Sequence, residues 1–225
     1  AVDMYYLLSH AISKNREFML AHPEYEMGFY SYTRCKRMLR RRIRGVPAAY
    51  LTGEKEFYGL AFHVNRHTLI PRPDTEILVE TALDLFASGA RIEVADLGTG
   101  SGAIALALAS ERPEWHIIAT DLSTAALEVA RINAAANRLD HVRLAHGHWF
   151  DALPDAARYD LLVSNPPYIR SDDPHLEQGD VRFEPDMALT SGADGLDAIR
   201  HLVSHAADHL KPAGVLMLEH GYDQG

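Results

Sequence analysis

The chain of 225 residues suits one large domain or one domain with an appendage. Its 47% hydrophobic and 24% charged residues, with only 15 Gly and 11 Pro, exclude a collagenous or wholly disordered chain. The apolar runs are too short to cross a bilayer, no secretory segment opens the chain, and the single cysteine, Cys35, cannot form an internal disulfide. We therefore expect a cytoplasmic protein that has no membrane partner.

The net charge of −9 is unevenly distributed along the chain. Residues 1–60 hold ten basic and six acidic side chains, whereas residues 61–225 hold twelve basic and 25 acidic ones. This asymmetry predicts two regions that face different partners. It argues against a general nucleic-acid-binding protein, because the larger domain of such a protein is typically basic.

The first region is predicted to be helical and to lead into a hairpin. Apolar residues recur at helical spacing near residues 5–12 and over residues 29–44, and Gly45-Val46-Pro47 stops the second of these helices. Two short alternating runs within residues 54–64 predict a β-hairpin. A hinge is expected at residues 68–73, where two prolines bracket an arginine.

Strands and helices are predicted to alternate through the rest of the chain. A helix is expected to begin at Pro73 and to end at Gly89, and a strand–helix alternation follows it. This order predicts an α/β fold with a doubly wound, mainly parallel, Rossmann-like sheet, whose ligand lies at the carboxyl ends of the strands. The expected strands cover residues 92–97, 116–120, 142–145, 161–164 and 214–219, and the expected helices cover 103–110, 124–137 and 193–210.

A glycine-rich turn joins the first of these strands to its helix, in the run Asp96-Leu97-Gly98-Thr99-Gly100-Ser101-Gly102. Glycines at alternate positions allow a bulky, flat ligand to approach the backbone closely. Asp121 ends the next strand, where an acid can accept hydrogen bonds from both ribose hydroxyls of a nucleoside. A nucleotide-like ligand is favoured over a tight turn without a ligand, but the glycines alone do not choose the cofactor.

The loop Asn165-Pro166-Pro167-Tyr168 follows another apolar strand. Its prolines remove two N–H donors, so the loop offers acceptors, namely the Asn165 side-chain oxygen and prolyl carbonyls. Two acceptors suit an NH₂ group, whose lone pair they would aim at an electrophile, and Tyr168 can stack on the planar group. The alternative, a proline-rich turn that merely ends a strand, is disfavoured by the neighbouring glycine turn.

Together these motifs resemble the class I S-adenosylmethionine-dependent methyltransferases of the Asn-Pro-Pro-Tyr type. The runs Ile70-Pro71-Arg72-Pro73-Asp74-Thr75-Glu76, Phe183-Glu184-Pro185 and Leu218-Glu219-His220-Gly221 are similar to those of the HemK/PrmC family. Members of that family are protein-(glutamine-N5) methyltransferases that modify the Gly-Gly-Gln loop of peptide-chain release factors. The resemblance implies methyl transfer from S-adenosylmethionine to a glutamine amide, with S-adenosylhomocysteine as product. It implies a release factor as partner, no direct nucleic-acid substrate, no metal and a monomeric enzyme.

The same resemblance assigns roles to two sets of residues. In the catalytic loop, Asn165 and the Pro166 carbonyl would hold the amide, with Pro167 beside them and Tyr168 as a wall of the pocket. Asp121 would hold the ribose of the cofactor, and Trp149 would lie by its adenine. The remaining cofactor-binding residues are expected to be Gly98, Thr99, Gly100, Ser101 and Gly102, with Asn165 bordering both ligands.

The resemblance also predicts the domain boundaries and points to two departures. Residues 1–50 would form a helical substrate-docking domain, residues 51–72 a hairpin and linker, and residues 73–225 the methyltransferase domain. His148 stands where the family often has an acid, so an acidic contact to the adenine amine is not expected. The family's closing segment is not found after residue 219, and we expect the C-terminal end to be incomplete.

Three other functions stay open at this point. The first is N5-glutamine methylation of a ribosomal protein. The second is N6-adenine methylation of DNA or RNA, which the same loop geometry would serve, although such enzymes usually carry a basic recognition domain. The third is a non-catalytic nucleotide-binding or NAD-dependent module, which would leave the Asn-Pro-Pro-Tyr loop unexplained.

Three further features have ordinary structural explanations. His201, His205 and His209 recur at helical spacing, and we expect them on the solvated side of their helix and not at a metal. The basic cluster within residues 34–44 is either a solvated helix face or a docking surface. Arg72 is expected to stiffen the hinge.

Overall fold

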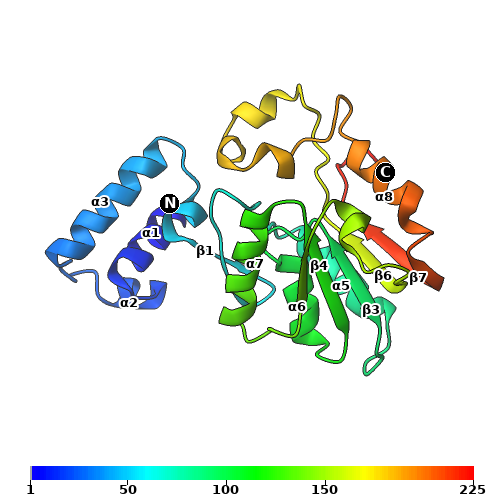
Figure 1. The fold of residues 1–225 in the computed structure, drawn as a ribbon. Coiled ribbons are helices and arrows are strands. Elements are labelled where there is room, and N and C mark those ends of the chain that lie inside the picture. The colour runs from blue at the N-terminus through cyan, green and yellow to red at the C-terminus, as the bar shows by residue number, and fades with distance from the viewer. Residues whose placement is uncertain (1) are drawn as a thin grey trace. The chain divides into compact units, whose positions relative to one another are not determined.

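The structure is a computed structural model that describes residues 2–225. The chain forms two compact units (Figure 1). The first unit contains the residues up to Glu54 together with a later segment, His175–Phe183, and the second contains Lys55–Pro174 and Glu184–Gly225. Within residues 2–225, no helix combines the length and the apolar character that crossing a membrane requires.

The first unit is helical, and ion pairs attach the later segment to it. The Arg42 guanidinium contacts Asp3 through Nη2 and Asp180 through Nη1, each at 2.8 Å, and Arg182 donates to the Arg44 carbonyl at 2.7 Å. The apolar interior of the unit includes the buried Leu7, Ala11, Cys35 and Met38. Its helices are α1 (Val2–Ile12), α2 (Arg16–Ala21), α3 (Phe29–Ile43) and α4 (Ala48–Thr52).

Two of these helices, α2 and α4, were not predicted from the sequence. They contain six and five residues, too few for an apolar period to be recognised. Helix α2 depends on its cap, because the Asn15 side chain accepts a hydrogen bond from the Phe18 amide at 2.9 Å. The predicted helices at residues 5–12 and 29–44 are present as α1 and α3.

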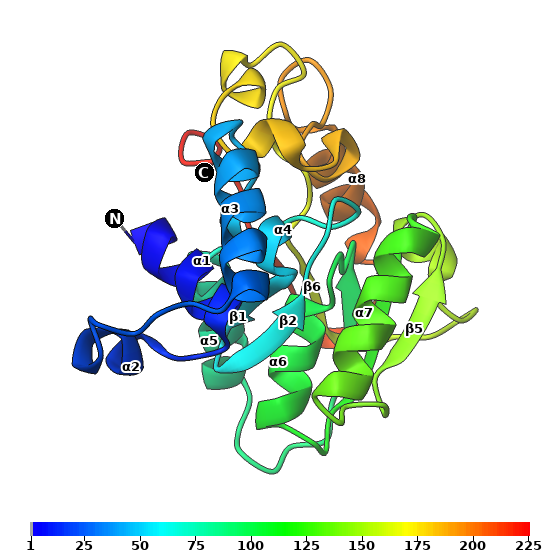
Figure 2. The ribbon, with the colours of Figure 1, turned by 90° about the vertical axis from the view of Figure 1, so that its left-hand side faces the viewer.

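The second unit confirms the predicted α/β fold. Its five-stranded sheet is parallel throughout, in the order β5-β4-β3-β6-β7. Helices α5, α6 and α7 cover one face of the sheet and α8 covers the other, which is clear when the view of Figure 1 is compared with that of Figure 2. The elements are α5 (Thr75–Leu85), β3 (Glu93–Leu97), α6 (Ala103–Glu111), β4 (His116–Asp121), α7 (Thr124–Ala136), β5 (Arg143–His146), β6 (Tyr159–Ser164), α8 (Asp197–Ala206) and β7 (Leu210–Leu218).

The central strands and helix α6 are buried on all sides, as a doubly wound sheet requires. Strand β3 sits between β4 and β6, and its residues from Val94 to Leu97 are almost completely inaccessible to solvent. Continuous apolar runs such as Leu161–Val163 of β6 are typical of strands covered on both faces. Helix α6 is buried from Ala103 to Ala109, so it has no polar face, and its small alanines allow it to pack closely.

The predicted hairpin is present as β1 (Glu54–Phe57) and β2 (Leu60–His63). Asn133, a buried residue of α7, holds strand β2: its Oδ1 accepts from the His63 amide at 2.6 Å, and its Nδ2 donates to the His63 carbonyl at 3.0 Å. The same Nδ2 donates to the Ser101 carbonyl at 2.8 Å. A single buried amide therefore connects β2 to the glycine-rich turn.

The predicted bounds of helices α5 and α8 are wrong, and so is the predicted start of strand β7. Helix α5 begins at Thr75 and ends at Leu85, because residues 72–74 form a turn before it and Phe86 is extended. Helix α8 is shorter than predicted, since Leu210 pairs with Tyr159 and opens strand β7 instead. An ion pair of 2.7 Å between Lys211 and Asp160 supports this pairing. Contact with the neighbouring strand outweighs the local helical pattern here.

Candidate active site

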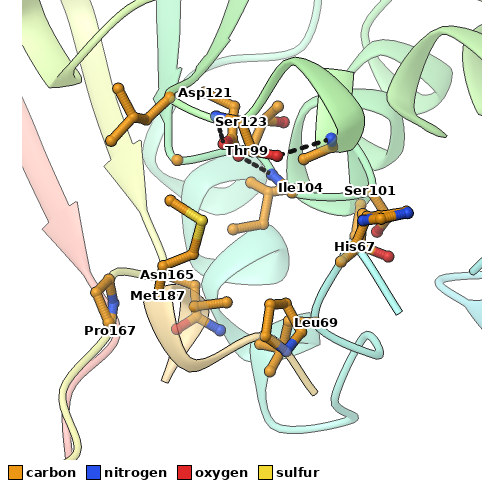
Figure 3. Close-up of a pocket in the computed structure, with 18 of the residues that line it drawn as sticks. His67, Leu69, Thr99, Ser101, Ile104, Asp121, Ser123, Asn165, Pro167 and Met187 are labelled. Carbon is orange, nitrogen blue, oxygen red and sulfur yellow. Dashed lines mark hydrogen bonds between the residues drawn. The ribbon is translucent and has the colours of Figure 1, made fainter. Parts of the chain in front are cut away.

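A cavity of about 320 Å³ lies at the carboxyl ends of β3, β4 and β6, where ligands of open α/β sheets bind. All of its lining residues belong to the second unit. Figure 3 shows Asp121, Thr99 and Ser123 at one side of the cavity, and Asn165 and Pro167 at another. Further lining comes from the hinge, around His67–Arg72, and from residues 185–190.

The glycine-rich turn needs glycine for two different reasons. Gly98 and Gly100 have φ angles of +76° and +59°, which L-residues with a side chain rarely adopt. A Cβ atom on Gly98 would lie 2.9 Å from Cζ3 of Trp149, so the indole packs directly on this glycine. A Cβ on Gly100 would meet no atom within 4 Å, which leaves its backbone open to the cavity.

The buried carboxyl of Asp96 braces this turn. It accepts hydrogen bonds from the Thr99 hydroxyl, within the turn, at 2.6 Å and from the Ala105 amide, in the first turn of α6, at 3.2 Å. Complete burial raises the pKa of Asp96 to about 7, although both hydrogen bonds oppose the rise. The sequence analysis assigned Asp96 no role, and its position at the end of a buried strand was the available signal.

Asp121 lies at the end of β4 with both carboxylate oxygens facing backbone amides. Oδ2 accepts from Gly100 and Oδ1 from Ser123, each at 2.8 Å (Figure 3). Burial raises the pKa of Asp121 above the ordinary range, and the two amide hydrogen bonds counteract this. Each oxygen retains a lone pair for a further donor.

At the other side of the cavity, Asn165 belongs to a chain of polar side chains. Its Nδ2 donates to the Thr75 hydroxyl at 3.1 Å, and Thr75 in turn donates to Glu219 at 2.7 Å. The Tyr168 hydroxyl donates to the other oxygen of Glu219 at 3.1 Å. Burial, followed by the charge of Glu219, raises the pKa of Tyr168 to about 12, so this hydroxyl keeps its proton at neutral pH.

The hinge arginine, which was expected to stiffen the hinge, has a partner that the sequence did not indicate. Arg72 forms an ion pair with Glu184, a carboxylate that is completely buried and that also accepts from the Ile70 amide at 3.0 Å. Arg72 lines the cavity as well. The pair therefore joins the hinge to the segment that follows residue 183.

The structure brings most of the predicted site residues to this one cavity. Three of them do not line it: Gly102, Pro166 and Tyr168. Gly102 packs on helices, because a Cβ there would lie 3.0 Å from Leu106 and 3.4 Å from Ala130. The predicted residues that do line the cavity are Gly98, Thr99, Gly100, Ser101, Asp121, Trp149, Asn165 and Pro167.

His201 and His205 lie on α8 and His209 follows it; His205 is exposed as predicted, whereas His201 and His209 are partly buried. The His209 ring stacks on Phe150 at a centroid distance of 4.5 Å, and His201 contacts His205 at 4.4 Å and His148 at 5.3 Å. Partial burial lowers the pKa of both His201 and His209. Among residues 2–225, no three His, Cys, Asp or Glu side chains gather in a way that could hold a metal ion.

Comparison with known proteins identifies the family. The methyltransferase small domain matches residues 73–179, and the PrmC N-terminal domain matches residues 1–53. The release factor glutamine methyltransferase of Xylella fastidiosa (strain Temecula1) is 50% identical over 224 residues, which cover 100% of this chain and 81% of that protein. The chain belongs to the release factor glutamine methyltransferase family. The Shewanella oneidensis member is 47% identical, over 99% of this chain and 77% of that protein.

Solved methyltransferase structures share the fold of this family member. A methyltransferase from Pyrococcus furiosus superposes with a TM-score of 0.53 at 22% identity, covering 81% of this chain and 78% of that one. The catalytic domain of hMettl16 gives a TM-score of 0.54 at 21% identity, covering 71% and 61%. At these identities the likeness concerns the fold alone.

Proposed function

We propose that this release factor glutamine methyltransferase transfers a methyl group from S-adenosylmethionine to the side-chain amide nitrogen, N5, of the glutamine in the Gly-Gly-Gln motif of release factors. The observation that carries the proposal is the pair of acceptors at the end of β6. Asn165 Oδ1 and the Pro166 carbonyl receive no hydrogen bond from any residue in the described part of the chain. Asn165 lines the nucleotide-sized cavity, and Pro166, which is buried, directly follows it, so the two free acceptors of this loop suit an NH₂ group that is to be methylated.

The residues at the other side of the cavity fit S-adenosylmethionine. The open backbone at Gly100 admits a flat ligand, and Asp121 keeps lone pairs for ribose hydroxyls. The Trp149 indole, held against Gly98, offers an apolar surface for an adenine ring. When bound, the cofactor would supply a methyl group on a positively charged sulfur, which leaves as the neutral thioether of S-adenosylhomocysteine.

The work of the catalytic loop is to orient the amide. An amide nitrogen is a weak nucleophile because its lone pair is delocalised into the carbonyl. Asn165 Oδ1 and the Pro166 carbonyl would each hold one hydrogen of the NH₂ group, which directs the lone pair toward the methyl group and favours a pyramidal nitrogen. The nitrogen becomes acidic once it gains the methyl group and then loses a proton to water, so no side chain is assigned as a general base.

We assign the helical residues 1–50 to substrate docking, residues 51–72 to the hairpin and linker, and residues 73–225 to methyl transfer. The exposed arginines of α3 support docking, since the catalytic region is strongly acidic and unsuited to an acidic partner surface. This assignment implies a cytoplasmic role in translation termination. A protein substrate is favoured over nucleic acid because the acidic catalytic region would repel phosphates.

Incubation with methyl-labelled S-adenosylmethionine tests the proposal. The expected result is label on an intact release factor and none on a release factor whose Gly-Gly-Gln glutamine is replaced by glutamate. Parallel reactions with ribosomal proteins and with DNA or RNA serve as the competing substrates. Label on either of those, and none on the release factor, would contradict the proposed substrate.

A further inference from the structure

Two side chains, Thr75 and Glu219, determine how the Asn165 amide is turned, and of these two Thr75 also lines the cavity. Asn165 follows β6, Thr75 is the first residue of α5, and Glu219 directly follows β7. The contacts run from Asn165 Nδ2 to Thr75 Oγ1 at 3.1 Å and from Thr75 Oγ1 to Glu219 Oε2 at 2.7 Å. Tyr168 Oη donates to the remaining carboxylate oxygen at 3.1 Å.

The chemistry of these groups gives the chain of hydrogen bonds a single direction. The Glu219 carboxylate can only accept, so the Thr75 hydroxyl must donate its one proton to Glu219. The Thr75 oxygen is then left as an acceptor, and the Asn165 group that faces it must be the donor, the NH₂ group. Asn165 Oδ1 is consequently the end of the amide that stays available for another molecule.

A reversed Asn165 amide would be disfavoured at both ends. Its oxygen would face the Thr75 oxygen, and two acceptors at about hydrogen-bonding distance repel each other. Its NH₂ group would take the place of the acceptor and would meet the substrate NH₂ donor to donor. Thr75 is 5% exposed, so water has little access to relieve the mismatch at that end.

We propose that Thr75 and Glu219 are positioning residues for methyl transfer, which act through Asn165 by holding its amide oxygen in the accepting orientation. This inference rests on the proposed function, because it assumes that Asn165 Oδ1 holds the substrate amide. Glu219 carries the negative charge at the end of the chain of hydrogen bonds and accepts the Thr75 proton. Thr75 therefore presents its oxygen to Asn165 as an acceptor. Neither residue contacts the substrate in this scheme.

The test compares variants at Thr75 with a matched control on the same helix. Thr75→Val removes the hydroxyl and keeps the shape, Thr75→Ser keeps the hydroxyl, and Thr81→Val removes an exposed hydroxyl that bonds only to its own helix. We expect Thr75→Val to lower kcat roughly ten- to a hundred-fold, with cofactor affinity and KM for the release factor changed less than about threefold. Thr75→Ser should recover most of the lost kcat, and Thr81→Val should resemble the parent.

A double-mutant cycle tests whether Thr75 affects methyl transfer through Asn165. If Thr75 acts through Asn165, Thr75→Val should cause no further loss of kcat in the Asn165→Ala background. An equal loss in both backgrounds, or a Thr75→Val variant with parental kcat, would overturn the inference. If Asn165→Ala itself keeps parental kcat, the proposed role of Asn165 fails, which is a different result from a failure of Thr75 alone.

Glu219→Met tests the same inference independently of Thr75, because it leaves helix α5 unchanged and keeps a side chain of similar length. It releases the Thr75 proton to donate to Asn165, which permits the reversed amide. We expect a loss of kcat comparable to that of Thr75→Val, with cofactor affinity retained in a variant whose thermal unfolding is cooperative. Parental kcat in Glu219→Met would exclude Glu219 as a positioning residue, whatever the stability of the Thr75 variants.

Discussion

Replacement of Asp121 by alanine should weaken cofactor binding by a predictable amount. Each oxygen of this carboxylate accepts one backbone amide and keeps a lone pair for a ribose hydroxyl. Loss of a charged acceptor for hydroxyl donors costs about 1.5–3 kcal/mol, which corresponds to a roughly ten- to 150-fold higher Kd for S-adenosylmethionine. Isothermal titration calorimetry on the purified variant measures this directly.

The Asp121→Ala substitution also leaves the Gly100 and Ser123 amides without their acceptor, so the variant must first be shown to remain folded. Asp140→Ala, at an exposed aspartate outside the cavity, controls for the loss of one negative charge. Burial raises the pKa of Asp121. As the pH is lowered, the cofactor affinity of the parent should therefore begin to weaken at a pH above the ordinary pKa of an aspartate. Unchanged affinity in a folded Asp121→Ala variant would remove Asp121 from the cofactor site.

Two further predictions concern stability and docking. Burial raises the pKa of Asp96 from 3.8 to about 7, so the folded state binds this proton more tightly than the unfolded state. The stability that Asp96 contributes should therefore be lost as pH rises from about 4 to 7, by up to about 1.4 kcal/mol per pH unit. Asp96→Asn should abolish this dependence in urea unfolding, and a stability difference that stays constant with pH would contradict the prediction. Charge reversal at the exposed Arg40 and Arg41 should slow methylation of an intact release factor but not of a short Gly-Gly-Gln peptide. Charge reversal at Arg42, which pairs with Asp3 and Asp180, should instead lower the Tm. Equal loss with both substrates would argue against docking by α3.

The alternation of strands and helices along the chain was predictable because the signals for it are local. A buried strand such as β6 contains a continuous apolar run, and the glycine-rich turn after β3 marks the start of the helix that follows. The start of β7 was not predictable in this way, since it depends on pairing between Tyr159 and Leu210, about fifty residues apart. The local helical pattern therefore extended the predicted helix to Leu210, which belongs to strand β7.

The candidate site shows the same division between local and distant information. Gly98, Asp121 and Asn165 stand in short motifs whose chemistry is evident in sequence, and the structure brings them to one cavity. Thr75 lies 90 positions from Asn165, and Glu219 lies 51 positions from Tyr168. These contacts therefore exist only in the folded chain. Both residues stand in runs that resemble the family, which indicated that they matter but did not indicate which side chains they contact.

The attachment of His175–Phe183 to the helical unit is a second feature that distance along the chain concealed. Asp180 lies 138 positions from its partner Arg42, and no motif in either segment suggests the pair. The sequence analysis treated the arginines of α3 as one basic cluster. In the structure, Arg42 differs from Arg40 and Arg41 because it bridges two carboxylates.

Asn165 is proposed to orient a glutamine amide, and single-turnover methylation by Asn165→Ala measures this role. With cofactor and enzyme in excess over an intact release factor, we predict a rate about a hundred- to a thousand-fold below that of the parent, because one preorganised hydrogen-bond partner of the reacting group is lost. Calorimetry on the same preparation should give a cofactor Kd within about threefold of the parental value, since Asp121 and the glycine-rich turn remain intact. A parental single-turnover rate, or a loss of rate that is fully explained by loss of cofactor binding, would contradict the claim.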